Sequence, residues 1–331
     1  MKVLVVGGAG YIGSHMCKTL MNLGHDVVIL DNLSTGFREL AKYGKLVVGD
    51  LEDREFLDGL FSRYQLDGVV HFAAASLVGE SIVDPAKYYR NNVSNTINLL
   101  DTMRGHNVKN LVFSSSAAVY GEPNSNLINE SHTKEPINPY GSTKLMIERI
   151  LQDYAPAYGL NSVSLRYFNA CGADPEGELG ECHDPETHLI PLILQAASGR
   201  RKSITVFGSD YATDDGTCVR DYIHVNDLCT AHALALDKLA KSNNLGALVY
   251  NLGSGSGFSV QQVIDVVQAE VGKDGYHLTV EYGERRPGDP AKLVADTAKA
   301  KYELNWRPKY NDLNMIVTHA WKWEKKLARI D

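Results

Sequence analysis

The stretch Val3-Leu4-Val5-Val6-Gly7-Gly8-Ala9-Gly10-Tyr11-Ile12-Gly13 runs from an apolar strand straight into a glycine-spaced turn. Its four leading apolar residues are typical of a buried parallel strand. The glycines allow a tight turn in which backbone N–H groups can approach a pyrophosphate, and a helix that begins near Tyr11 directs its positive end at that anion. The spacing fits both G-x-G-x-x-G and G-x-x-G-x-x-G, so it predicts a bound dinucleotide.

A second apolar stretch, Val27–Leu30, ends on an acidic residue, Asp31. This acid follows Gly13 by 18 residues, which is close to the spacing at which a carboxylate hydrogen-bonds the adenosine ribose of a dinucleotide. A carboxylate there would repel a 2′-phosphate, so the pattern favours NAD over NADP. The alternative is an ordinary strand–turn–helix with a solvated aspartate, and the surrounding strand–helix–strand context disfavours it.

Composition is that of an ordinary globular protein. The 331 residues can bury a large core and form two lobes. The net charge of −7 argues against a nucleic-acid partner, and no apolar stretch is long enough to span a bilayer, so we expect no membrane partner and a cytoplasmic location. The five cysteines are scattered, and no group of His, Asp or Glu shows metal-ligand spacing, so we expect neither a disulfide framework nor a metal site.

Strand and helix signals alternate through the first half of the chain. Further strands are predicted at 45–48, 68–72, 110–113 and 162–166, with helices at about 53–64, 85–104 and 139–158. This alternation predicts an α/β fold with a Rossmann-type doubly wound parallel sheet, whose ligands lie beyond the C-terminal strand ends. After Asn169 the pattern becomes irregular, up to a last helix near 312–327.

We therefore predict two lobes. The NAD-binding Rossmann domain would span 1–168, with a return segment at about 224–252. The smaller α/β substrate-binding lobe would be formed by 169–223 and 253–331.

Tyr140 and Lys144 lie at the start of the predicted helix at 139–158, on one face because their spacing is i, i+4. A phenol titrates near a pKa of ~10. A nearby ammonium and a cationic nicotinamide ring would both favour the phenolate and lower the pKa of Tyr140, making it a proton acceptor near neutral pH. The run Ser114-Ser115-Ser116 closes the preceding strand, and one of its hydroxyls is expected to face the same substrate oxygen. The Tyr-x-x-x-Lys spacing alone is common on surface helices and gains its meaning from the dinucleotide motif.

With these residues the chain resembles the extended short-chain dehydrogenase/reductase family over almost its full length, and within it the branch that acts on nucleotide sugars. The motifs that carry the resemblance are GGAGYIG at 7–13, DN at 31–32, GDL at 49–51, HFAA at 71–74, YYRNNV at 88–93, SSSAAVYG at 114–121, YGSTK at 140–144, RYFN at 166–169, VRDYIHV at 219–225 and RRPGD at 285–289.

The resemblance implies that NAD stays tightly bound through the catalytic cycle. Tyr140 would be the proton acceptor, Ser116 the catalytic hydroxyl, and Lys144 would hold the nicotinamide ribose and tune Tyr140. All three would also contact the cofactor. The other implied cofactor contacts are Gly7, Gly10, Tyr11, Ile12, Gly13, Asp31, Asn32, Leu33, Ser34, Thr35, Gly36, Asp50, Leu51, Phe72, Ala73, Ala74, Asn91 and Phe168.

The implied reaction interconverts UDP-glucose and UDP-galactose by oxidation at C4, rotation of the 4-ketose and reduction on its opposite face. The implied substrate contacts are Ser116, Tyr140, Asn169, His188, Leu189, Arg220, Arg286 and Asp289. The two arginines suit a diphosphate, because a planar guanidinium group can donate two hydrogen bonds to phosphate oxygens. From the residues alone, Arg220 could equally pair with a neighbouring aspartate, Arg286 could pair with Asp289, and Asn169 could simply cap a turn.

Two positions depart from the family pattern. Ser76 stands where a basic residue is often found near the cofactor phosphates, which leaves its role open. Leu293 stands in the sugar pocket and is intermediate in size between the family's Tyr and Cys, so tolerance of N-acetylated UDP-sugars stays open beside the expected UDP-glucose and UDP-galactose. The helices at 85–104 and 139–158 would form the interface of a homodimer.

Other activities remain as alternatives. They are a UDP-N-acetylhexosamine 4-epimerase, an epimerase or decarboxylase of UDP-uronic acids, a dehydrogenase that releases its cofactor, and a non-catalytic NAD-binding scaffold. A 4,6-dehydratase is disfavoured because Ala117 and Ala118 follow the catalytic hydroxyl, where that chemistry needs an added acid and base.

Overall fold

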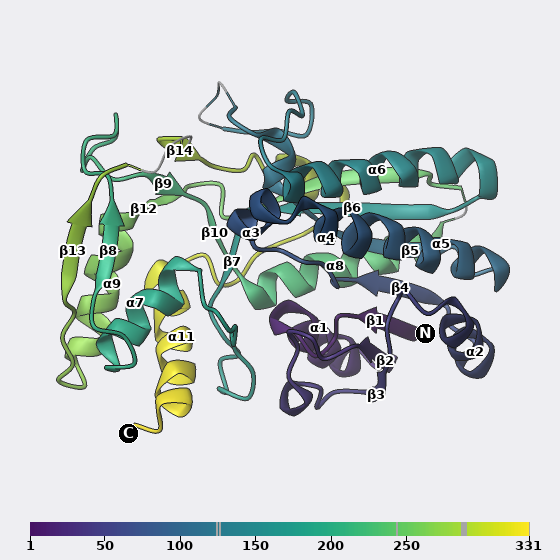
Figure 1. The fold of residues 1–331 in the computed structure, drawn as a ribbon, viewed down its shortest axis with the longest axis horizontal. Helices are drawn as coiled ribbons and strands as arrows, with labels where there is room; N and C mark the ends of the chain where they lie inside the picture. Colours follow the sequence, from purple (N-terminus) through teal and green to yellow (C-terminus); the bar gives the residue numbers. More distant parts are fainter. Residues whose placement is uncertain (124, 126, 243, 286–289, 331) are drawn as a thin grey trace.

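A seven-stranded sheet is the centre of the larger lobe (Figure 1). The computed structural model describes residues 1–123, 125, 127–242, 244–285 and 290–330. The strands lie in the order β11-β6-β5-β4-β1-β2-β3, and every neighbouring pair is parallel. They are β1 (Lys2–Val6), β2 (Asp26–Asp31), β3 (Lys45–Val48), β4 (Gly68–His71), β5 (Asn110–Ser116), β6 (Asn161–Tyr167) and β11 (Ala247–Leu252). The predicted Rossmann-type doubly wound parallel sheet is confirmed.

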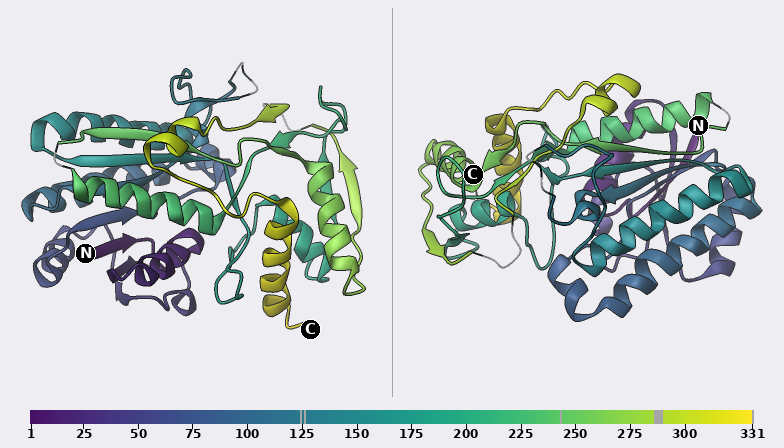
Figure 2. Two further views of the ribbon diagram at one scale, coloured as in Figure 1. Left: turned by 180° about the vertical axis from the view of Figure 1, so that it is seen from behind. Right: turned by 90° about the horizontal axis from the view of Figure 1, so that it is seen from above.

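Helices cover both faces of this sheet, which is why β1 is apolar at every position. Val3 and Val5 of β1 belong to the core that α1 and α8 cover. Leu4 and Val6 point to the other face and join the core beneath α2, α5 and α6. Viewed from above, α5 and α6 lie on one side of the strands and α8 on the other (Figure 2). These helices are α1 (Tyr11–Asn22), α2 (Arg54–Tyr64), α5 (Asn95–Gly105), α6 (Pro139–Tyr158) and α8 (Val225–Lys241).

The strand order reverses next to β1. From β1 the chain builds outward through β2 and β3 on one side, and through β4, β5 and β6 on the other. In open α/β sheets a ligand crevice forms at such a switch point, outside the carboxyl ends of the strands. The glycine turn that follows β1 therefore lies where the topology places a ligand.

The helix predicted over 85–104 is interrupted in the structure. The segment is divided into α4 (Pro85–Tyr88), the π-helical η2 (Tyr89–Ser94) and α5. Asn92 explains the interruption, because its side chain accepts a hydrogen bond from the backbone N–H of Ala75 (2.8 Å) and donates one to the carbonyl of Ala75 (3.0 Å). A wider helical turn presents this buried amide to the loop after β4.

The smaller lobe has its own apolar core, formed mainly by α7, α9, α11 and the β8–β13 pair (Figure 1). Its elements are β7 (Asn169–Cys171), α7 (Leu189–Ala197), β8 (Ile204–Phe207), β9 (Val219–Arg220), β10 (Tyr222–His224), β12 (Phe258–Ser259), α9 (Val260–Gly272), β13 (Val280–Gly283), β14 (Lys292–Leu293) and α11 (Leu313–Ala328). The remaining elements of the chain are η1 (Arg38–Leu40), α3 (Val78–Val83), η3 (Ala117–Tyr120) and α10 (Ala298–Glu303).

The chain passes back and forth between the two lobes. After β7 it enters the smaller lobe, returns through α8 and β11, and leaves again through β12. One segment that the sequence assigned to the smaller lobe packs elsewhere: Trp306 is fully buried in the core of the seven-stranded sheet, and its Nε1 donates to the Asp227 carbonyl of α8 at 3.0 Å. Within the described ranges, we find no helix long and apolar enough to cross a membrane.

Candidate active site

The turn after β1 has room for backbone only. Gly7 has φ of 79°, and a Cβ there would lie 2.7 Å from the backbone nitrogen of Ala73. A Cβ at Gly13 would lie 2.0 Å from the carbonyl oxygen of Gly7. The helix α1 follows with Gly10 at its N-cap and no side-chain cap, so the N–H groups of its first turn stay available to an anion.

The carboxylate of Asp31 joins this turn to the loop after β2. One of its oxygens accepts from the backbone N–H of Ala9 at 2.9 Å and the other from that of Leu33 at 2.8 Å. Asn32 then donates to Asp50, after β3, at 2.7 Å. The structure thus brings the predicted ribose and adenine residues together at the carboxyl edge of β1, β2 and β3. The backbone N–H of Phe37 donates to the carbonyl of Ala9 at 2.9 Å, which holds the loop against the glycine turn. The other predicted residues of this loop and edge are Leu33, Ser34, Thr35, Gly36, Asp50 and Leu51.

The loop after β4 lies against the same turn. The backbone N–H groups of Phe72 and Ala73 both donate to the carbonyl of Val6, at 2.8 and 3.2 Å. Ala74 follows them and is partly buried. Asn91 on η2 donates to the side chain of Asn92, which holds this loop from the other side. The predicted cofactor residues from four separate stretches of chain therefore surround one edge of the sheet.

The three serines that close β5 have three different partners. Ser114 Oγ lies 2.5 Å from the hydroxyl of Tyr167, and Ser115 donates to Glu148 at 2.6 Å. Ser116 faces Tyr140, with which it hydrogen-bonds. Neighbouring side chains on a strand point to opposite faces, so the run separates on folding. The predicted choice of Ser116 for the site agrees with this arrangement.

Burial controls the ionisation of Tyr140 and Lys144. It raises the pKa of Tyr140 above its usual value, and the hydrogen bond with Ser116 opposes that rise. Burial also lowers the pKa of Lys144 to about 7, against the attraction of Glu148. Among the protein's own groups, burial therefore keeps the pKa of Tyr140 above its usual value, with Nζ of Lys144 5.8 Å from the ring centre. The predicted lowering, which also involves the cationic nicotinamide ring, stays a prediction.

A buried ion pair lies behind this lysine, and the sequence analysis missed it. Lys144 donates to the carbonyl of Ser114 at 2.8 Å. One turn further along α6, Glu148 accepts from Nε of Arg166 on β6 at 2.8 Å, and both side chains are at most 3% exposed. The available signal was the continuation of the Tyr140 and Lys144 spacing to Glu148, again by four residues.

Among the described residues, the predicted substrate contacts other than Ser116 and Tyr140 belong to the smaller lobe. Asn169 on β7 donates to the carbonyl of Asp221 at 2.8 Å, so part of its amide is used in pairing β7 with β10. The carboxylate of Asp221 accepts from the backbone N–H groups of Ser254, Gly255 and Ala295.

Leu293 of β14 is the register partner of Arg220 on β9. Leu293 and Phe168 pack in the same small cluster around Val119. His188 is the N-cap of α7, and Leu189 is its first residue. Two predicted contacts, Arg286 and Asp289, lie outside the described residues.

These features fit NAD. The glycine cradle accepts a pyrophosphate only because no Cβ fills it, and Asp31 offers a carboxylate at the end of β2, where it disfavours a 2′-phosphate. The side chain of Tyr11 points elsewhere, since its hydroxyl donates to the carbonyl of Gly172 at 2.6 Å. Any contact of Tyr11 with the pyrophosphate would therefore come from its backbone.

Comparison with known proteins agrees with this site. Residues 3–253 match the NAD dependent epimerase/dehydratase family. A UDP-glucose 4-epimerase of Halalkalibacterium halodurans is 50% identical over 326 residues, which cover 98% of this chain and 96% of that protein. The crystal structure of UDP-glucose 4-epimerase from Brucella ovis in complex with NAD has a TM-score of 0.94 at 49% identity and covers 98% of both chains.

A more distant structure, UDP-glucose 4-epimerase from Bifidobacterium longum in complex with NAD⁺ and UDP, has a TM-score of 0.91 at 38% identity and also covers 98% of both chains. The identities, the coverage and the matched residues place both lobes within one group of proteins. The chain belongs to the NAD dependent epimerase/dehydratase family.

Proposed function

We propose that this protein interconverts UDP-glucose and UDP-galactose by inverting the configuration at C4, with NAD as its tightly bound cofactor. The observation that carries the proposal is the meeting of two parts at one edge of the sheet. The glycine cradle with Asp31 forms one part, and the Ser116–Tyr140–Lys144 group forms the other. Relatives named UDP-glucose 4-epimerase are 49–50% identical to this chain over 98% of its length, which supports this activity among those of the family.

Within the site, NAD supplies the acceptor and later the donor of the C4 hydride. Tyr140 is proposed to take the proton of the 4-hydroxyl and to return it in the reverse step. Ser116 hydrogen-bonds the tyrosine and is placed to hold the same sugar oxygen. Lys144 is held by the Ser114 carbonyl at 2.8 Å, and its ammonium would hold the cofactor ribose. Inversion further requires a sugar that turns while its nucleotide stays anchored.

The nucleotide anchor is proposed to come from the smaller lobe. Asn169 on β7 donates to the carbonyl of Asp221, and Arg220 on β9 directly precedes Asp221 in the chain. His188 and Leu189 would contribute backbone groups at the start of α7. Arg286 and Asp289 complete the proposed set from the sequence resemblance. Leu293 would limit the space beside the sugar, which favours the unmodified hexoses over their N-acetylated forms.

The first experiment is conversion of UDP-galactose to UDP-glucose by the purified protein with no NAD added, followed by a coupled assay. Conversion is expected, because the cofactor would stay bound through purification. Failure both without and with added NAD would reject the UDP-hexose assignment and bring UDP-uronic acids forward. Comparable turnover of UDP-N-acetylglucosamine would reject the proposed role of Leu293 instead.

Tyr140→Phe tests the proton acceptor. We expect turnover to fall by about 10²- to 10⁴-fold, the usual contribution of a general base, while the protein still carries NAD. The matched control is Tyr158→Phe, at a half-exposed position on the same helix, which should keep full activity. A Tyr140→Phe protein with unchanged turnover would show that another group moves the proton.

We further propose the division into a nucleotide lobe over 1–168 with its return at 224–252, and a substrate lobe from 169–223 and 253–331, apart from the segment around Trp306, which packs on the larger lobe. A homodimer is proposed through the helices at 85–104 and 139–158, and we extend the proposed face to the adjoining α3. Several large apolar side chains are exposed there, among them Ile82, Val83 and Met146. The five free cysteines fit the proposed reducing, cytoplasmic setting.

A further inference from the structure

Four potential metal ligands converge in the segment that precedes α7. Glu181, His183, Glu186 and His188 each offer one donor atom, and these atoms all lie within 4.8 Å of one another. The sequence analysis expected no metal site, because no group of His, Asp or Glu showed a familiar metal-ligand spacing. The spacing E-x-H-x-x-E-x-H lies in an irregular loop, so only the folded chain shows that the four side chains meet.

Each histidine nitrogen lies within 3.4 Å of an oxygen of both carboxylates. Nδ1 of His183 lies 3.2 Å from a Glu181 oxygen and 3.4 Å from a Glu186 oxygen. Nδ1 of His188 lies 2.8 Å and 2.9 Å from oxygens of the same two carboxylates. Four ligands bound to Zn²⁺ at 2.0–2.1 Å in a tetrahedron are about 3.3 Å apart. The four distances from histidine nitrogen to carboxylate oxygen, 2.8–3.4 Å, include this spacing, and one donor atom from each residue lies within 4.8 Å of the others.

The two carboxylates of this group are buried, whereas the side chains of His183 and His188 are 31% and 48% exposed. The side chains of Glu181 and Glu186 are only 6% and 5% exposed. Nδ1 of His183 is shielded from solvent and has no hydrogen-bond partner, although it faces two carboxylates. A buried imidazole nitrogen without a hydrogen bond, aimed into a group of carboxylate oxygens, is the arrangement expected around a cation.

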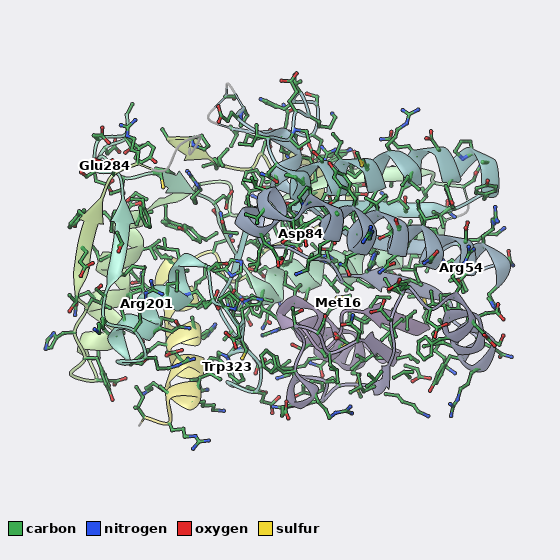
Figure 3. All side chains as sticks on the ribbon, viewed as in Figure 1. Met16, Arg54, Asp84, Arg201, Glu284 and Trp323 are labelled. Atoms are coloured by element: carbon green, nitrogen blue, oxygen red, sulfur yellow. The ribbon has the colours of Figure 1, made fainter. Side chains whose placement is uncertain are left out.

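Surrounding contacts hold the ligands in place. The backbone carbonyl of Glu181 accepts from Nε1 of Trp323 on α11 at 2.8 Å, beside the loop (Figure 3). One Glu186 oxygen accepts from the backbone N–H groups of Thr187 and His188, at 2.8 and 2.9 Å. Such outer contacts orient the ligands of metal sites. They also connect this cluster to the C-terminal helix.

We propose that Glu181, His183, Glu186 and His188 bind one Zn²⁺ ion that fastens the loop before α7. Two imidazoles and two carboxylates suit zinc, and two carboxylates neutralise its charge. A full set of four protein ligands is typical of a structural ion rather than a catalytic one. The competing arrangement is a metal-free quartet of ion pairs with both histidines protonated, which the same distances would allow.

The test uses the full-length protein after dialysis against a chelator. Zn²⁺ is titrated in competition with a chromophoric chelator, and bound metal is counted by mass spectrometry. We expect one equivalent in the wild type and in His277→Ala, which removes an exposed histidine elsewhere. His183→Ala should lower the affinity by more than about 100-fold, because loss of a ligand exceeds loss of an outer contact. Equal affinities for Zn²⁺ in all three proteins would favour the metal-free ion pairs and would overturn the proposed site.

Cobalt provides a second measurement that does not depend on a loss of binding. In His183→Cys, a Co²⁺-loaded protein should show a thiolate-to-cobalt charge-transfer band, whereas His277→Cys should show none. A missing band in His183→Cys, with the protein folded by circular dichroism, would place residue 183 outside the coordination sphere. Uptake of Mg²⁺ or Ca²⁺ in preference to Zn²⁺ would overturn the assignment to zinc.

Discussion

Lys144 is the residue whose charge depends most on where the fold places it. Its side chain is 3% exposed, and burial lowers its pKa to about 7 from the usual value of 10.5. The attraction of Glu148 only partly opposes this change. At neutral pH the lysine is therefore partly neutral in the protein's own field, and anything negative placed beside it would restore its charge.

This shift predicts a pH dependence of stability. Between about pH 7 and 10.5 the unfolded chain binds a proton that folded Lys144 has lost, so the free energy of unfolding should rise with pH. The contribution approaches ~1.4 kcal/mol per pH unit within this window, and below pH 7 the buried charge costs its full amount. Lys144→Met should remove the contribution.

Urea unfolding of the NAD-free wild type and NAD-free Lys144→Met across pH 6–10 measures it. Lys109→Met, at an exposed lysine, is the control and should follow the wild type. If the free energies of unfolding of the wild type and Lys144→Met change with pH in the same way, Lys144 titrates in the folded protein as it does in the unfolded chain.

The sequence predicted the members of this site better than their electrostatics. Ser116, Tyr140 and Lys144 follow from a strand end and an i, i+4 spacing, which are local properties. The direction of the tyrosine pKa depends on how much protein surrounds the ring, and burial is a property of the whole fold. The alternation of β5 places Ser115 on the face opposite Ser114 and Ser116, and the neighbouring elements then give each serine its own partner.

At the scale of elements, α6 presents a functional column of side chains. Tyr140, Lys144 and Glu148 follow one another at successive turns, and Glu148 joins the helix to β6 through Arg166. The pair is almost fully buried, so each charge depends on the other for its solvation. The position of the column against the sheet is fixed by this contact.

Breaking the buried pair should be costly. Glu148→Gln leaves Arg166 charged and unpaired in the core, and we expect the free energy of unfolding to fall by about 3–5 kcal/mol. Arg149→Ala is the matched control on the next residue, since its pair with Asp153 is exposed on both sides and should contribute less than ~1 kcal/mol. Chemical unfolding measures both, and equal losses would mean that solvent reaches the buried pair.

Element types were predictable where periodicity was strong, and boundaries were not where a single side chain intervened. The six strands and the helices around 53–64 and 139–158 follow from their apolar patterns. The break inside 85–104 comes from Asn92 reaching the loop after β4, a contact across 17 residues that no helical pattern contains. The meeting of Glu181 with His188 is a similar case, because it depends on the course of a loop.

For the whole molecule, the larger lobe is completed by distant chain. β11 pairs with β6 along its full length, and α8 covers the face that β4, β5 and β6 present to it. Tyr250 and Leu252 of β11 are fully buried in that core. The proposed nucleotide lobe is therefore incomplete without its return segment.

A fragment of residues 1–168 should not fold cooperatively. It would expose the apolar face that α8 and β11 cover, and a domain of this size cannot leave such a face in water. Thermal unfolding followed by near-ultraviolet circular dichroism compares it with the full chain, which serves as the control. A sharp transition in the fragment would show that the sheet is stable without the return segment.

The proposed homodimer can be tested through its apolar face. Ile82 on α3 is 63% exposed, and Ile82→Glu should shift the protein from dimer to monomer in light scattering after size-exclusion chromatography. Tyr302 on α10 is even more exposed, and Tyr302→Glu should leave the dimer unchanged. Dimers in both variants, or monomers in the wild type, would remove this face from the assembly.

The position of β11, far along the chain from β6, also affects how the protein folds during its synthesis on the ribosome. About 80 residues separate the end of β6 from the start of β11, and synthesis at ~5–20 residues per second takes roughly 4–16 s to cover them. During that interval the nascent sheet ends at β6, with an unpaired strand edge and an uncovered apolar face. A chaperone that binds nascent chains should therefore contact this protein most strongly between the synthesis of β6 and that of β11.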